Sequence, residues 1–155
     1  MTEPTTGQPA PDFTLPATGE RSFTLSAQHG RAVVLFFYPR ANTPGCTTEV
    51  QAFRDLAADF RAADCVIAGI SRDTLRIQER FRERHQLPFD LLADPEEAVC
   101  GLYAVMREKN LYGKRVRGIE RSTFLIDAHG VLRQQWRGVK VPGHADTVLA
   151  ALQAL

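Results

Sequence analysis

Three cysteines are spread along the 155-residue chain, and Cys46 occupies a position typical of a reactive thiol. It follows the apolar run Ala32–Phe37, which predicts a buried strand, and precedes a segment with the apolar spacing of a helix. Its neighbours, Thr-Pro-Gly before and Thr-Thr-Glu after, are too polar for a core position. Because a helix N-terminus favours a thiolate over a thiol, we expect Cys46 to be a nucleophile.

The helix terminus alone would not make the thiol of such a cysteine a fast-reacting nucleophile. Lowering the pKa of an ordinary thiol from about 8.5 to about 6 requires roughly 3.4 kcal/mol, whereas a helix terminus contributes about 1 kcal/mol. A cation, hydrogen-bond donors and groups that stabilise the transition state are therefore still needed. Thr43, three residues before Cys46, is a candidate to direct its hydroxyl at the sulfur, and we expect an arginine to converge on it.

The elements that must hold these groups follow from the hydrophobic pattern. Strands are predicted at Phe13–Leu15, Ser22–Leu25, Ala32–Tyr38, Cys65–Ser71, Leu87–Leu92, Ser122–Ile126 and Val131–Val139. Helices are predicted from Cys46 to about Ala63, from an Asp73 cap to His85 with Ile77 and Phe81 facing inward, from Asp94, and over Ala145–Leu155. The polar segment 1–8 is expected to be frayed. These elements predict an α/β fold with a mixed central sheet flanked by helices and an N-terminal β-hairpin, in one domain spanning residues 1–155.

Composition and charge exclude several classes of function. The formal net charge is +1, so electrostatics favour neither nucleic-acid nor membrane binding. The basic residues within Arg107–Arg121 are interpreted as a solvated loop and strand edge. No run reaches the roughly 18 apolar residues of a membrane span, and no signal peptide is visible.

Three cysteines do not suit a secreted disulfide framework, so we expect a cytoplasmic protein. The four histidines lack metal-ligand spacing, so neither a metal nor a cofactor is expected.

The residues around Cys46 carry a specific resemblance. The pattern Pro39-x-x-x-Thr43-x-x-Cys46 resembles the active-site signature of the peroxiredoxins. The wider string over residues 37–49, Phe-Tyr-Pro-Arg-Ala-Asn-Thr-Pro-Gly-Cys-Thr-Thr-Glu, is similar to the bacterioferritin-comigratory (PrxQ-type) branch. Residues 7–13 resemble the opening of that family, and Arg121–Asp127 resembles its later strand, which begins with the active-site arginine. The resemblance covers most of the chain.

This resemblance implies a thioredoxin-like fold and thiol-dependent reduction of hydrogen peroxide and organic hydroperoxides. Cys46 would be the peroxidatic cysteine and would form a sulfenic acid. Thr43 would hydrogen-bond the thiolate and the peroxide, and Arg121 would hold the sulfur anionic and donate to the oxygens. Pro39 would shield the sulfenic acid. Glu49 matches a position that orients the arginine, and the alternative is that it only complements the helix dipole.

The chain departs from the branch at the resolving cysteine, which relatives carry either five residues after the peroxidatic one or in the following helix. Gln51 occupies the first position, and Asp73–His85 contains no cysteine. Cys65 opens an apolar strand and is interpreted as part of the core. Cys100 is the remaining candidate for an atypical two-Cys mechanism. We favour a one-Cys mechanism, in which thioredoxin, glutaredoxin or a small thiol reduces Cys46.

Other functions remain open at this point. A thioredoxin-like disulfide reductase would need a second cysteine close after Cys46, where Thr47, Thr48 and Glu49 stand. A Cys-His hydrolase would need a histidine directed at Cys46. A non-catalytic redox sensor or chaperone-like module would react once and stop. The reductant is expected to dock on Tyr38, Pro44 and the loop Leu111–Gly113. The branch resemblance suggests a monomer.

Overall fold

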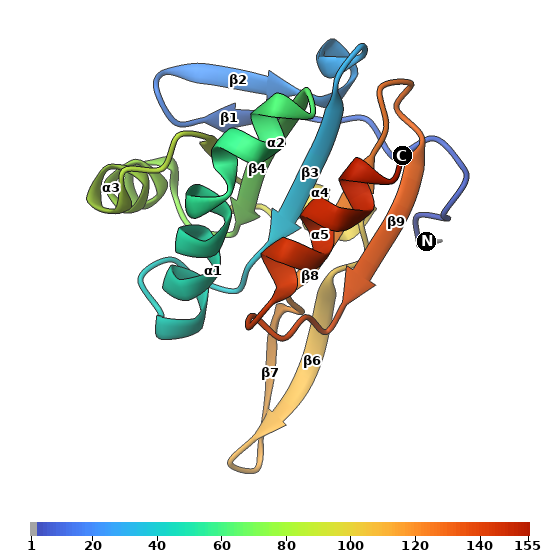
Figure 1. Ribbon diagram of the computed structural model, residues 1–155. Helices are drawn as coiled ribbons and strands as arrows, with labels where there is room; N and C mark the ends of the chain where they lie inside the picture. Colours follow the sequence, from blue (N-terminus) through green and yellow to red (C-terminus); the bar gives the residue numbers. More distant parts are fainter. Residues whose placement is uncertain (1–2) are drawn as a thin grey trace.

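A seven-stranded mixed sheet forms the centre of the molecule, as Figure 1 shows for the computed structural model. The structure describes residues 3–155. The strand order is β2-β1-β5-β4-β3-β8-β9. Its strands are β1 (Thr14–Ala17), β2 (Arg21–Thr24), β3 (Ala32–Phe37), β4 (Cys65–Ser71), β5 (Asp90–Ala93), β8 (Ser122–Ile126) and β9 (Leu132–Arg137). β3, β4 and β5 run parallel, and β8 runs antiparallel to β3.

Helices cover both faces of this sheet (Figure 1). They are α1 (Pro44–Asp55), α2 (Ala57–Ala62), α3 (Leu75–His85), α4 (Ala98–Leu102) and α5 (His144–Gln153), with a short 3-10 helix at Leu25–Gln28. β3 is buried along its whole length, and its side chains alternate between two cores. Val34 and Phe36 pack with α1, α2, α3 and α5. Val33 and Leu35 point to the opposite face, where α4 and the β1–β2 hairpin lie.

The observed architecture confirms the predicted mixed sheet, flanking helices and N-terminal hairpin, but two predicted helix starts are wrong. Thr74, not Asp73, caps α3 and accepts a hydrogen bond from Ile77 N. Phe81 faces inward as predicted, together with Gln78, whereas Ile77 is 37% exposed and the prediction that it faces inward is wrong.

The helix predicted from Asp94 begins later, at Ala98. The carboxylate of Asp94 accepts from Cys100 N at 2.8 Å, and Glu97 has a left-handed φ of 63°. Asp94 therefore caps the helix from outside it, and the residues between form a turn. Similarly, the helix predicted from Cys46 to Ala63 is interrupted at Leu56 and forms α1 and α2.

The basic segment predicted as a loop and strand edge forms a separate two-stranded sheet. β6 (Met106–Leu111) and β7 (Lys114–Ile119) pair antiparallel and project from the body of the molecule (Figure 1). The positive charge of this segment suggested only that it is solvated. The alternation of buried and exposed residues that usually identifies a strand is absent here, because most residues of β6 and β7 are exposed on both faces.

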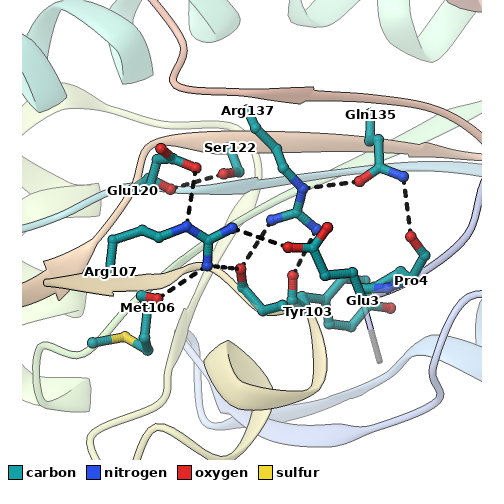
Figure 2. A network of polar contacts seen from close by, with 10 residues as sticks. Glu3, Pro4, Tyr103, Met106, Arg107, Glu120, Ser122, Gln135 and Arg137 are labelled. Carbon is teal, nitrogen blue, oxygen red and sulfur yellow. Dashed lines mark hydrogen bonds and ion pairs between the residues drawn. The ribbon is translucent and has the colours of Figure 1, made fainter. Parts of the chain in front are cut away.

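The N-terminal segment is attached to the sheet, so the predicted fraying does not hold for its described part. Gly7 N donates to Leu132 O at 2.7 Å, and Gln135 Nε2 donates to Pro4 O at 3.1 Å (Figure 2). Met1 and Thr2 lie outside the described residues. Within residues 3–155, no helix has the length and apolarity required to cross a bilayer.

Gly69 of β4 is expected to be intolerant of even one methyl group. A Cβ there would lie 2.7 Å from Phe36 Cζ and 2.9 Å from Leu91 Cδ2, inside the core. We expect Gly69→Ala to lower the free energy of unfolding by about 1–3 kcal/mol, measured by urea denaturation. The control is Gly101→Ala in α4, where a Cβ meets nothing within 4 Å, and a gain of up to about 1 kcal/mol is expected. Equal midpoints for the two variants would contradict the packing described.

Candidate active site

The pairing of β3 with β8 brings together residues that are distant in the sequence. Phe37, the last residue of β3, pairs with Ser122, the first residue of β8. Arg121 therefore lies beside the end of β3 where the chain passes into α1. The carboxyl ends of strands in open α/β sheets are where such folds place reactive groups.

Cys46 is the third residue of α1, and Thr43 is the N-cap. The first helical hydrogen bond runs from Thr47 N to Thr43 O at 2.9 Å, so the earlier amide groups have no partner within the helix. Cys46 is only 1% exposed. The sulfur thus lies inside the molecule at the positive end of a helix.

Arg121 joins Cys46 to Glu49. Its Nη2 lies 3.4 Å from Cys46 Sγ, and its Nη1 donates to Glu49 Oε1 at 2.6 Å. Cys46 and Glu49 are three residues apart, so they occupy one face of α1. Gly45 leaves room for the guanidinium, since a Cβ there would lie 3.2 Å from Nη2. The expected convergence of an arginine on the sulfur is present in this geometry.

Glu49 is almost completely buried and lies in the second turn of α1. Burial raises the pKa of its carboxyl to about 7, against the opposing attraction of Arg121. Burial also disfavours the charged guanidinium, but Glu49 and Cys46 together raise the pKa of Arg121. Within residues 3–155, Glu49 Oε2 has no hydrogen-bond partner. The contact with Arg121 favours orientation of the arginine over a role limited to the helix dipole.

The loop before α1 is held at one peptide unit from both sides. Ala41 N donates to Asp73 Oδ2 at 2.7 Å, and Thr43 Oγ1 donates to the carbonyl of Arg40 at 2.8 Å. The hydroxyl proton of Thr43 is therefore directed away from the sulfur, contrary to our expectation. The hydroxyl oxygen keeps lone pairs that can accept a proton from a ligand.

Asp73 is the supporting residue that sequence reasoning missed, because it was assigned as a helix cap. Its carboxylate also accepts from Ser71 Oγ at 2.6 Å. A signal was available, since Asp73 follows β4 and the carboxyl ends of adjacent parallel strands meet at one edge.

Tyr38 and Pro39 lie at the end of β3. Tyr38 is fully buried and donates to Gln78 Oε1, so the prediction that it forms part of a docking surface is wrong. Desolvation raises the pKa of Tyr38 well above its ordinary value. Pro39 is half-buried and cannot donate to a strand partner, which ends β3. Pro44 is exposed at the start of α1.

The other two cysteines are far from this arrangement. Cys65 pairs with Ala32 at the opposite end of β3. At 3.3 Å per strand residue, that end lies roughly 16 Å from Phe37, where the chain leaves β3 for α1. Cys100 is fully buried in the core on the other face of the sheet from Cys46. Burial raises the pKa of Cys65 to about 12 and also raises that of Cys100. Neither thiol can bond to Cys46 without a large rearrangement, since a disulfide needs Cα atoms within about 7 Å.

The nearby histidine does not form a Cys-His pair. His144 Nε2 lies 2.8 Å from Thr123 Oγ1, and its ring packs edge-on against Phe53 and Trp136. Burial, aided by Arg121, lowers the pKa of His144 to about 4. The observed partner of the Cys46 sulfur is a guanidinium, which disfavours the hydrolase alternative. No group of three or more metal-ligating side chains occurs in the part of the chain described.

Comparison with known proteins shows the family to which this chain belongs. Residues 6–135 match the model of the AhpC/TSA family. The chain belongs to this family. It is 46% identical to Peroxiredoxin Bcp of Xanthomonas campestris, over 99% of this chain and 98% of that protein. It is also 46% identical to Peroxiredoxin Bcp of Bacillus subtilis, over 96% and 93% of the two chains. The chain is therefore a peroxiredoxin enzyme of the Bcp (PrxQ-type) branch, as its motifs predicted.

Solved structures of this branch have the same fold. Peroxiredoxin Q of Xanthomonas campestris superimposes with a TM-score of 0.88 at 46% identity, covering 92% of this chain and 90% of its own. The predicted thioredoxin-like α/β fold is thus confirmed. One structure of the Xanthomonas protein concerns its alkyl peroxide reduction activity. Two others are variants that each have a different cysteine replaced by serine.

The ionisation of Glu49 should make the stability of this peroxiredoxin depend on pH. Because its pKa is raised in the folded state, to about 7 from an ordinary 4.5, Glu49 favours folding below about pH 4.5. That contribution is lost as the pH rises through 7. We expect the free energy of unfolding of wild type to fall between pH 5 and 7 relative to Glu49→Gln, measured by urea denaturation.

The matched control is Glu79→Gln, which alters an exposed carboxylate on α3. Its pH dependence should follow wild type. Parallel pH profiles for wild type and Glu49→Gln would refute the assignment of the effect to Glu49.

Proposed function

We propose that this peroxiredoxin reduces hydrogen peroxide and alkyl hydroperoxides through a sulfenic acid on Cys46, and that an external thiol restores the cysteine. The observation that carries the proposal is the contact of Arg121 Nη2 with Cys46 Sγ at 3.4 Å. This contact places the fixed positive charge of the guanidinium beside the sulfur, which lies in the first turn of α1. The alkyl peroxide activity of the Xanthomonas relative supports the choice of substrate.

In the first half-reaction, the Cys46 thiolate attacks one oxygen of the hydroperoxide ROOH. An S–O bond forms and the O–O bond breaks, so the sulfur is oxidised to a sulfenic acid and the peroxide is reduced to ROH. Arg121 stabilises the negative charge that develops on the oxygens as the bond stretches. Because the hydroxyl proton of Thr43 is donated to the carbonyl of Arg40, Thr43 Oγ1 accepts a hydrogen bond from the O–H of the incoming peroxide, whose oxygen joins the sulfur with its proton. The leaving alkoxide takes a proton from solvent and departs as ROH. Pro39 limits access of water to the sulfenic acid.

In the second half-reaction, an external thiol R′SH attacks the sulfenic acid. An S–S bond forms and the S–O bond breaks, which releases water. A second thiol then attacks the external sulfur of this mixed disulfide and releases the Cys46 thiolate and R′SSR′. The positions of Cys65 and Cys100 favour this one-Cys route over resolution by Cys100. A redox sensor would react with peroxide once and stop, so steady consumption of peroxide with a thiol donor would distinguish the enzyme from a sensor.

The two half-reactions make different demands on α1. A peroxide is small, but a protein thiol cannot touch a sulfur that is 1% exposed. The first turn of α1 must therefore open during reduction. Pro44, Gly45 and Thr48 are exposed, so opening this turn loses little buried surface beyond Cys46 itself.

Removing the guanidinium should slow the first half-reaction while the fold persists. We expect Arg121→Ala to lower the second-order rate constant for peroxide by roughly 100-fold or more, as is typical for loss of a transition-state donor. Stopped-flow measurement of Cys46 oxidation gives this rate, and circular dichroism checks folding. A loss under tenfold would count against the role of Arg121.

Cys46→Ser is the matched control and should abolish peroxide consumption with every thiol donor. Retention of wild-type turnover by this variant would overturn the proposal.

The one-Cys route predicts the product of stoichiometric oxidation. One equivalent of peroxide should leave Cys46 as a sulfenic acid, which a dimedone adduct reports in mass spectrometry, with Cys65 and Cys100 still reduced. Cys100→Ser should retain wild-type turnover with an external thiol. A Cys46–Cys100 disulfide as the main product would instead establish the two-Cys alternative.

A further inference from the structure

The β6–β7 hairpin extends beyond what the fold needs. From Glu108 to Arg117 every residue is exposed, and none belongs to either hydrophobic core. Tyr112 at the turn is 97% exposed, the highest value among the large hydrophobic residues that are exposed. An aromatic side chain in this position contributes nothing to folding by burial, and aromatic residues of this kind are enriched at protein interfaces.

One face of the hairpin combines apolar and basic side chains. Lys109 pairs across the strands with Val116, and Leu111 pairs with Lys114, so these four residues share one face. Leu111 is 53% exposed and Val116 is 40% exposed. We call these four residues, together with Tyr112, the hairpin face.

The charges of the hairpin face are not neutralised by the protein. Within residues 3–155, neither Lys109 nor Lys114 forms a salt bridge. On the opposite face, Arg115 pairs with Glu108 and Arg117 pairs with Glu97. The segment Met106–Ile119 carries five basic residues and one acidic residue, in a chain whose net charge is +1. The hairpin face therefore complements an acidic surface with an apolar centre.

The root of the hairpin is fixed to the body of the protein, which limits the entropy that a partner must remove on binding. Arg107 Nη1 donates to Ala104 O at 2.7 Å, and its guanidinium also lies near Glu3 and Glu120 (Figure 2). On the other strand, Arg72 Nη2 donates to the carbonyl of Arg117 at 3.4 Å.

The same root adjoins the candidate active site. β7 ends at Ile119, two residues before Arg121, which contacts the Cys46 sulfur. Arg72 directly precedes Asp73, which holds the loop before α1. The hairpin and the start of α1 lie at the same end of the molecule in Figure 1. A protein seated on the hairpin face is thus held at the end of the molecule where α1 begins, next to the segment that carries Arg121.

We propose that the hairpin face is the docking site for the protein that reduces Cys46, a dithiol protein with acidic side chains around an apolar surface next to its thiol. This inference rests on the proposed function, because it requires an external reductant. In this proposal the hairpin face binds the reductant, and the thiol–disulfide exchange takes place at Cys46.

The experiment compares two kinds of reductant at low ionic strength. Turnover of hydrogen peroxide is measured with a panel of acidic thioredoxins and glutaredoxins, each with its own reducing system, and with dithiothreitol. For the protein donor that wild type uses best, Lys109→Glu/Lys114→Glu should lower kcat/KM by about tenfold or more, since like charges now repel. Added salt should reduce the difference. Tyr112→Ser should lower kcat/KM several-fold at all salt concentrations.

The matched control is Arg80→Glu/Arg84→Glu, which makes the same charge change on exposed residues of α3 and should remain within twofold of wild type. All variants should keep wild-type rates with dithiothreitol and in the single-turnover oxidation of Cys46. The docking proposal is overturned if no protein donor exceeds dithiothreitol, if the hairpin variants stay within twofold, or if the control loses as much. Absence of turnover with every thiol, dithiothreitol included, would instead contradict the proposed function.

Discussion

The ion pair between Arg121 and Glu49 is the constraint on which the site depends. An arginine directed at a buried sulfur would be unstable alone, because both burial and the loss of water disfavour its charge. Glu49 compensates for that loss from the next turn of the same helix that carries Cys46. One carboxylate thus fixes the guanidinium against both the helix and the sulfur. The price is a buried carboxylate whose second oxygen has no partner in the part of the chain described.

The surrounding sheet fixes the positions of the groups around this pair. β3 leads directly into the loop before α1. Arg121 directly precedes the antiparallel neighbour β8, and Asp73 follows the parallel neighbour β4. Three neighbouring strands therefore each place one group at the same edge. Since all three strands are held by a core of fully buried side chains, the groups are preorganised before any substrate binds.

Much of this arrangement could be predicted from the sequence, and what failed has a physical explanation. Ala32–Phe37 was recognisable because a strand buried on both faces has no polar interruptions, and Cys46 because polar residues follow that strand. The hydroxyl of Thr43 was assigned wrongly because its partner is the carbonyl of Arg40, a loop contact that residue spacing does not reveal, on a peptide unit that the distant Asp73 also holds. The hairpin was missed because exposed strands lack the burial pattern on which the prediction relied.

The burial of Cys46 has a kinetic consequence for the enzyme. In the proposed cycle, peroxide meets the closed site, whereas the reductant meets the opened one, so the two substrates react with different conformations of one chain. At high peroxide the catalytic cycle acquires a ceiling set by how often the first turn of α1 opens, which no increase in reductant can exceed. Sequence changes at Pro44 would then change the rate of opening, and with it turnover, without altering the contact of Arg121 with the sulfur.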